Sequence, residues 1–235
     1  MKQTTFAALA ALTTAFVVAI ILCLHALWLP QAVFAATDAK MTVVLDAGHG
    51  GIDGGVTGKT TGIKESEINL AITLALKEEL TDMGFEVILT RKTDAGLYDT
   101  TAKGFKKRDM QRRKEIIQAA TPSLVISLHQ NFYPSQSTRG AQVFYGKADD
   151  NSKRLADCLQ TQLNGLYAKQ EVKPRHSMPA EYFILQCSTA PTALIECGFL
   201  SSARDEALLS SPAFRENLAK SIAAGIMDFF AENTA

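Results

Sequence analysis

Three short apolar runs rich in β-branched residues and leucine constrain the fold of this chain more than any other feature. They occupy residues 41–47, 124–128 and 192–195. Runs that are apolar at nearly every position are typical of strands buried on both faces of a parallel sheet. Each run ends at or just before a polar residue, namely His49, His129 or Glu196. Because the carboxyl ends of parallel strands meet at one edge of the sheet, we expect these three side chains to share a crevice.

Helical patterns separate these strands along the chain. Residues 67–83 repeat apolar residues at helical spacing, and Gly84 ends that helix before a strand at residues 85–90. Further helices are expected at residues 108–120, 149–167 and 212–230, and further strands at residues 141–145 and 182–185. The alternation predicts an α/β fold, a three-layer sandwich with a largely parallel central sheet and helices on both faces.

One domain is expected after an N-terminal leader. Residues 41–235 are enough for a single full core and show no internal repeat or low-complexity linker. Within this domain, residues 92–107 form a long connection that we expect to be a surface loop beside the crevice.

The leader, residues 1–36, has Lys2 as its single charged residue, and residues 6–29 are nearly all apolar. A basic start, an apolar centre and small residues near Ala35 are typical of a cleaved signal peptide. The apolar run is also about long enough to span a bilayer, so an uncleaved membrane anchor remains an alternative. Both interpretations place the domain outside the cytoplasmic membrane.

Charge and cysteine content exclude several classes of protein. The formal net charge is zero, which gives no electrostatic reason to expect nucleic-acid binding. Cys23 lies in the leader, and the remaining cysteines are Cys158, Cys187 and Cys197. We favour buried thiols for all three, with a Cys187–Cys197 disulfide as the alternative, and they lack the close spacing of metal ligands.

A glycine-rich segment that ends in Gly58, Lys59 and Thr60 is similar to the end of a phosphate-binding P-loop. That motif needs a glycine five residues before Gly58, where this chain has Asp53, whose charge repels phosphate. Nucleotide binding is therefore not expected.

Two imidazoles and one carboxylate are the ligand set of a catalytic zinc that keeps one position open for water. His49 and His129 supply the imidazoles, and two glycines after His49 leave room for a substrate. The alternatives are a turn residue for His49 and a hydrogen-bonded core residue for His129. Glu196 ends an apolar strand, where an unpaired carboxylate is costly, so a functional role is favoured.

Four ordered blocks of this chain resemble the motifs of a known enzyme family. They are DAGHGGIDGG at residues 46–55, ESEINL at 65–70, SLHQN at 127–131 and ECGFLS at 196–201. Together they resemble the zinc-dependent N-acetylmuramoyl-L-alanine amidases, which hydrolyse the amide between the lactyl group of muramic acid and the first L-alanine of peptidoglycan. Ser66 departs from the lysine usual in the second block. The leader, the single domain and the basic segment 103–113 resemble the germination-specific amidases of endospore formers, which act on the spore cortex.

The resemblance implies that His49, Glu65 and His129 bind zinc. It also implies that Glu196 is the general base, which takes a proton from water and passes it to the leaving nitrogen. Motif spacing favours Glu65 over Glu67, although an acidic residue at a helix start also suits the helix dipole.

Five further residues are candidates for supporting roles. Asp46 and Asp53 could orient a ligand imidazole. Arg91, Asn131 and Arg175 are candidates for substrate binding, since a guanidinium suits a carboxylate of the stem peptide. The alternatives are pairing with Asp94 for Arg91, and a solvated loop for Arg175.

The expected partner is peptidoglycan, with the membrane as a second partner if the leader is uncleaved. The resemblance to cortex amidases adds a separate muramic-acid deacetylase that acts on the product. The domain is expected to be secreted or anchored to the outer face of the cytoplasmic membrane. The alternatives are a zinc carboxypeptidase or deacetylase, and a wall-binding module with a structural metal. A structural site would need a fourth tight ligand in place of a free Glu196.

Overall fold

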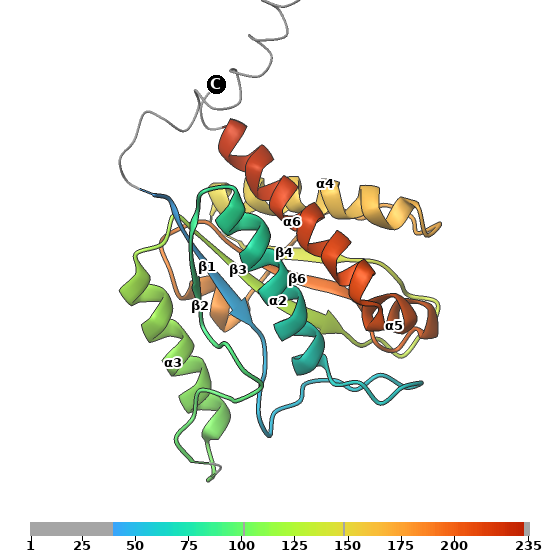
Figure 1. Cartoon of the computed structure of the whole chain (residues 1–235), viewed down its shortest axis with the longest axis horizontal. Helices are drawn as coiled ribbons and strands as arrows, with labels where there is room; N and C mark the ends of the chain where they lie inside the picture. Colours follow the sequence, from blue (N-terminus) through green and yellow to red (C-terminus); the bar gives the residue numbers. More distant parts are fainter. Residues whose placement is uncertain (1–39, 101, 148, 233–235) are drawn as a thin grey trace, which may run out of the picture. The chain divides into compact units, whose positions relative to one another are not determined.

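A six-stranded sheet forms the centre of the compact unit Met41–Ala235 (Figure 1). The computed structural model describes residues 40–100, 102–147 and 149–232. The strands are β1 (Thr42–Ala47), β2 (Glu86–Leu89), β3 (Leu124–Asn131), β4 (Gln142–Gly146), β5 (Met178–Ala180) and β6 (Thr192–Phe199). Their order is β2-β1-β3-β6-β4-β5, and all neighbours are parallel except β4 and β6. The predicted leader and Cys23 lie outside the described residues.

Alternate residues of the central strands contribute to two hydrophobic cores. In β1, Val43 and Leu45 belong to the larger core, whereas Val44 belongs to the smaller one. The period of two follows from the pleat of a strand, which directs successive side chains to opposite faces. Each face of the sheet therefore carries apolar side chains, which other elements must cover to keep them from water.

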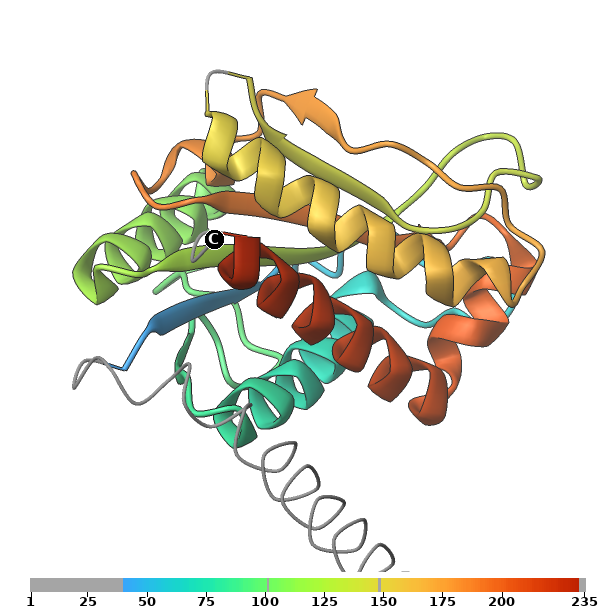
Figure 2. The same ribbon diagram turned by 90° about the horizontal axis from the view of Figure 1, so that it is seen from above.

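Helices supply that cover on both faces (Figure 2), which confirms the predicted three-layer α/β sandwich. The larger core is covered by α2 (Glu65–Asp82), α4 (Asp150–Ala168) and α6 (Pro212–Glu232). The smaller core is covered by α3 (Phe105–Ala120) and the 3-10 helix η1 (Phe183–Gln186).

The predicted strand at residues 182–185 is wrong, because these residues form the turn of η1. Ile184 and Leu185 are buried in the smaller core, but Phe183 is 47% exposed. The edge of the sheet is instead occupied by β5, which pairs with β4. A run of four apolar residues is too short to show whether its pattern repeats with the period of a strand or with that of a helix.

Two helix starts and one whole helix also differ from the prediction. α2 begins at Glu65 and α3 at Phe105, two and three residues earlier than expected. The short helix α5 (Ala203–Ser210) was not predicted. Its two acidic residues, Asp205 and Glu206, are both buried through polar contacts with distant segments, which a local pattern does not reveal.

The three cysteines outside the leader are buried free thiols, which confirms the favoured interpretation and makes the Cys187–Cys197 disulfide wrong. No helix within residues 40–232, as far as they are described, has the length and apolar character needed to cross a bilayer. The apolar run at residues 6–29 lies outside this search.

The carboxyl ends of β1, β3 and β6 meet at one edge of the sheet. Ala47 of β1 is in register with Leu128 of β3, and the next residue, His129, is in register with Glu196 of β6. Parallel pairing of three adjacent strands therefore places the end of each motif beside the next.

Candidate functional site

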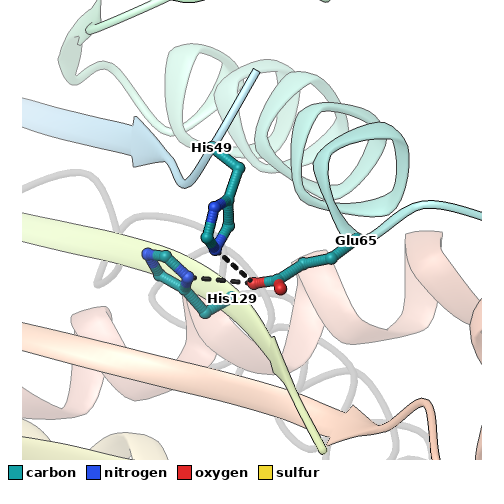
Figure 3. Close-up of side chains that lie close together, drawn as sticks. All are labelled: His49, Glu65 and His129. Atoms are coloured by element: carbon teal, nitrogen blue, oxygen red, sulfur yellow. Dashed lines mark hydrogen bonds and ion pairs between the residues drawn. The ribbon is translucent and has the colours of Figure 1, made fainter. Parts of the chain in front are cut away.

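His49, Glu65 and His129 converge at this edge, from the segment after β1, the start of α2 and strand β3 (Figure 3). Glu65 Oε1 lies 3.2 Å from His49 Nε2 and 3.0 Å from His129 Nδ1. The two imidazole rings meet edge to face with their centroids 5.0 Å apart. Three side chains from separate segments thus direct one donor atom each to a common point.

The donor atoms fit a zinc ion by spacing and by chemical type. Zinc bonds to imidazole nitrogen and carboxylate oxygen are about 2.0–2.2 Å long, so two ligand atoms of a tetrahedral ion are roughly 3.3 Å apart. The two observed nitrogen–oxygen distances, 3.2 and 3.0 Å, are close to that separation. Both imidazoles are partly exposed to the crevice, which leaves a side of the site open.

The carboxylate of Glu65 is the most firmly held of the three groups. Its Oε2 accepts the backbone N–H of Val56 at 2.9 Å, and its Oε1 accepts that of Gln130 at 3.0 Å. Burial opposes its charge, but the two imidazoles outweigh burial and lower its pKa well below the usual range. Glu67 is exposed and takes no part in the cluster, so the geometry favours Glu65 over Glu67.

His49 occupies a left-handed backbone conformation, with φ of 61°, that non-glycine residues rarely adopt. Its Nδ1 lies 3.1 Å from Asp53 Oδ2, and Asp53 Oδ1 lies 3.0 Å from Lys106 Nζ. Burial opposes protonation of His49, but Glu65 and Asp53 outweigh it and raise the pKa of the imidazole. Asp53 is thus placed to orient this ring, as expected of a carboxylate behind a metal ligand.

Glycine is required next to His129. A Cβ on Gly48 would lie 2.2 Å from His129 Cε1 and 2.3 Å from its Nε2, far inside van der Waals contact. The first glycine of the motif, Gly48, therefore leaves space for the imidazole of the neighbouring strand.

Asp46 does not contact either imidazole. The prediction that its carboxylate orients a ligand imidazole directly is therefore wrong. It is buried and accepts hydrogen bonds from Thr90 Oγ1 and Ser127 Oγ, both at 2.7 Å, and from Arg113 Nη1 at 2.6 Å. Arg113 Nη2 in turn donates to the carbonyl of His49 at 2.6 Å. Asp46 therefore supports the backbone of His49 through Arg113, and the sequence analysis had assigned Arg113 no role.

Burial of the Asp46 carboxylate opposes its charge, but Arg113, Ser127 and Thr90 together lower its pKa to about 2. Arg113 itself is buried and also donates from Nε to Asp109 Oδ2 at 2.6 Å. Each buried charge in this group has a partner, which is the condition for keeping charges in a protein core.

Glu196 lies in the same crevice, a hollow of about 420 Å³ that is also lined by the three clustered residues. Its Oε2 is buried and accepts no hydrogen bond from any described residue. Burial is the main cause that raises the pKa of Glu196 to about 7, and the charge of Glu65 adds to it. A carboxyl group of this kind can take up and release a proton near neutral pH.

The family of this chain is shown by its similarity to known proteins. Residues 43–228 match the family model described as N-acetylmuramoyl-L-alanine amidase. The chain belongs to this amidase family.

Individual relatives of the family agree with this assignment. The germination-specific N-acetylmuramoyl-L-alanine amidase of Bacillus subtilis (strain 168) is 36% identical over 196 residues, which are 81% of this chain and 80% of the relative. The N-acetylmuramoyl-L-alanine amidase AmiA of Escherichia coli (strain K12) is 27% identical over 238 residues, 83% of this chain and 78% of the relative. The CwlD amidase from Clostridioides difficile, solved in complex with the GerS lipoprotein, has a TM-score of 0.78 and 36% identity over 82% of this chain and 99% of that one.

Arg91 is not available to a substrate of the amidase, which corrects its predicted role. Its side chain is buried and donates to the backbone carbonyls of Ala47, Gly48, Ser66 and Thr93 at 2.8–3.0 Å. It therefore joins the end of β1 to the first turn of α2, and so supports the segments that carry His49 and Glu65.

Asn131 and Arg175 lie in different places. Asn131 lines the crevice with Glu196, and its Oδ1 accepts the backbone N–H of Phe132 at 2.7 Å. Arg175 lines a separate hollow, and its Nε and Nη2 donate to the carbonyl of Arg139 at 3.3 and 3.0 Å. The structure thus brings Asn131, but not Arg175, into the crevice.

The connection at residues 92–107 lies beside the site, as predicted. The hydroxyl of Tyr98 accepts the N–H of Ile52 at 2.7 Å and donates to the carbonyl of Gly50 at 3.3 Å. Lys106, at the start of α3, reaches Asp53. Neither residue was singled out from the sequence, because each acts through a contact with a segment about fifty positions away.

Proposed function

We propose that this chain is a zinc-dependent N-acetylmuramoyl-L-alanine amidase that hydrolyses the bond between the lactyl group of muramic acid and L-alanine in peptidoglycan. The observation that carries the proposal is the position of Glu196 in the crevice of the His49, Glu65 and His129 cluster, with a buried Oε2 that has no hydrogen-bond partner among the described residues. Membership of the amidase family supports the choice of bond.

Each residue of the crevice has one role in this reaction. His49, Glu65 and His129 would hold zinc, which when bound lowers the pKa of a water ligand to about 7 and polarises the scissile carbonyl. Glu196 takes the proton of the attacking water and delivers it to the nitrogen of the departing L-alanine. The same carboxyl group thus acts first as a base and then as an acid.

Three other side chains support these roles. Asp53, held by Lys106, keeps His49 Nε2 directed towards the shared point by binding the Nδ1 side of the ring. The amide of Asn131 lies in the crevice with its Nδ2 group unpaired among the described residues, so it is available to a substrate carbonyl.

The biological setting follows from the relatives. The Bacillus subtilis relative is named germination-specific, and we extend a role in spore-cortex maturation to this chain. It would act outside the cytoplasmic membrane, with residues 1–36 as its export signal or anchor. A separate muramic-acid deacetylase would then use the muramic acid that the amidase leaves without its peptide.

Product analysis tests the proposed function. The zinc-loaded protein is incubated with purified peptidoglycan, and the new end groups are identified by mass spectrometry. Free N-terminal L-alanine is the expected product. A released D-amino acid would show a carboxypeptidase, acetate would show a deacetylase, and binding without any product would show a wall-binding module.

A further inference from the structure

A polar hollow of about 760 Å³ lies at the same edge of the sheet as the metal crevice, on the side of α5. Three segments form its walls, residues 136–139, 171–175 and 202–204. The first wall follows β3, which carries His129, and the third follows β6, which carries Glu196. The hollow is therefore built from direct continuations of two strands that form the crevice.

The two strand ends are tied together between the crevice and the hollow. Leu200 N–H donates to the carbonyl of Asn131 at 2.9 Å, and Tyr133 N–H donates to Ser201 Oγ at 3.0 Å. Ser202 is six positions after Glu196, so the chain between them spans at most about 20 Å. An extended peptide covers roughly 3.3 Å per residue, so four or five residues attached at the crevice reach about 13–17 Å towards the hollow.

The lining of the hollow is strongly cationic, with four basic residues against one acidic residue, Glu171. The basic residues are Arg139, Lys173, Arg175 and Arg204.

Two of these cations belong to the framework of the hollow. Arg139 Nε lies 3.1 Å from Oδ1 of the buried Asp205, so most of its charge is neutralised. Arg175 binds the carbonyl of Arg139 and lies 5.4 Å from the centre of the Phe199 ring. These contacts hold the walls in place but leave little of either guanidinium for a ligand.

Lys173 and Arg204 are different, because neither has a hydrogen bond or ion pair with another described residue. Both side chains are exposed, and they belong to two different walls of the hollow. A pair of unpartnered cations on a fixed framework is suited to anionic groups, and carboxylates are such groups.

The crevice has a contrasting hollow on its other side, near α3 and η1. This one, of about 340 Å³, shares His49 and His129 with the crevice and has apolar and aromatic side chains in its lining, including Tyr98, Phe105 and Phe183. Its charged residues are paired with one another, Asp46 and Asp109 with Arg113, and Asp53 with Lys106. The site therefore separates a region suited to uncharged groups from a region suited to anions.

We propose that the cationic hollow binds the stem peptide on the leaving-group side of the scissile amide, with Lys173 and Arg204 as contacts for its free carboxylates. The proposal rests on the proposed amidase function, because that function supplies a substrate with an uncharged muramoyl part and an acidic peptide part. The contact with a stem-peptide carboxylate, first expected from Arg175, is thereby assigned to Lys173 and Arg204. Arg175 instead holds the walls of the hollow in place.

The test compares two synthetic muramoyl tetrapeptides, one with free carboxylates and one with the same groups converted to carboxamides. The value of kcat/KM for each is measured with the zinc-loaded wild type and with the double variant Lys173→Gln, Arg204→Gln. Exposed ion pairs contribute modestly, so we expect the wild type to prefer the free acid by about 3- to 30-fold and the double variant to lose that preference. The change should lie in KM, and added salt should weaken the wild-type preference.

A matched control is the double variant Lys77→Gln, Lys220→Gln, which removes the same charge from exposed positions of α2 and α6 away from the hollow. It should keep the wild-type preference. Equal rates on both substrates with the wild type, or a preference that survives in the Lys173/Arg204 variant, would overturn the inference while leaving amidase activity intact. Cleavage of neither substrate by the wild type would refute the proposed function itself, and this inference with it.

Discussion

Replacement of the buried Asp46 by asparagine tests the support behind the metal site. The carboxylate of Asp46 accepts hydrogen bonds from Arg113, Thr90 and Ser127, and Arg113 continues to the carbonyl of His49. Asp46→Asn keeps the shape of the side chain but removes its charge. Arg113 then remains buried with Asp109 as its one remaining anionic partner.

The size of the effect follows from two independent arguments. A pKa of about 2 in the folded protein, against the ordinary 3.8, corresponds to about 2 kcal/mol of stability at neutral pH. Removal of one partner from a buried ion pair typically costs about 3–5 kcal/mol. We therefore expect Asp46→Asn to lower the free energy of unfolding by about 2–5 kcal/mol, or Tm by roughly 5–15 °C for a domain of this size.

The assay is thermal and urea unfolding of the metal-free domain, monitored by circular dichroism from about pH 8 to about pH 2, so that it covers the range in which Asp46 is protonated. Because the pKa of Asp46 is lowered by folding, its contribution is complete above about pH 4 and is lost as the pH falls from 3.8 towards 2. The difference between wild type and variant should accordingly shrink only at the acid end. Glu181→Gln is the control, since Glu181 is 73% exposed and paired with an exposed Lys147, and should unfold at the same temperature and urea concentration as the wild type. A loss below about 1 kcal/mol in Asp46→Asn would refute the reasoning.

Two further changes test the metal site itself. His129→Ala removes one of the three proposed ligands, so we expect zinc to be lost while the fold is kept; full zinc occupancy by elemental analysis would show that His129 is not a ligand. Gly48→Ala places a methyl group 2.2 Å from the position of the His129 ring, so it should displace that ligand and weaken zinc binding by about 10- to 100-fold, as measured against a competing chelator. Gly165→Ala, on α4 with open space around its Cα, is the matched glycine control and should bind zinc like the wild type.

Features that depend on local periodicity could be predicted from the sequence. The apolar runs at β1, β3 and β6 identified the parallel centre of the sheet, and the polar residue at each end identified the functional edge. Glu65 was located through the family motif, because no local pattern distinguishes it from Glu67 as a ligand.

Features that depend on contacts between residues far apart in the sequence could not be predicted. Arg113 looks like one of several basic residues on α3, and its burial follows from contact with Asp46, 67 positions earlier. Arg91 ends a strand, where a guanidinium could face solvent, but four backbone carbonyls from three segments surround it. α5 is held by its buried acidic residues, whose partners include Gly140, 65 positions before Asp205, and Thr60, 146 positions before Glu206.

The central claim is that Glu196 carries the proton in zinc-dependent hydrolysis and is not itself a ligand. Zinc content and turnover of a muramoyl peptide are therefore measured side by side for the wild type and for Glu196→Gln. The account predicts that Glu196→Gln keeps one zinc per chain but loses about 10²–10⁴-fold in kcat. Near-normal turnover in this variant, or loss of its zinc, would contradict the account.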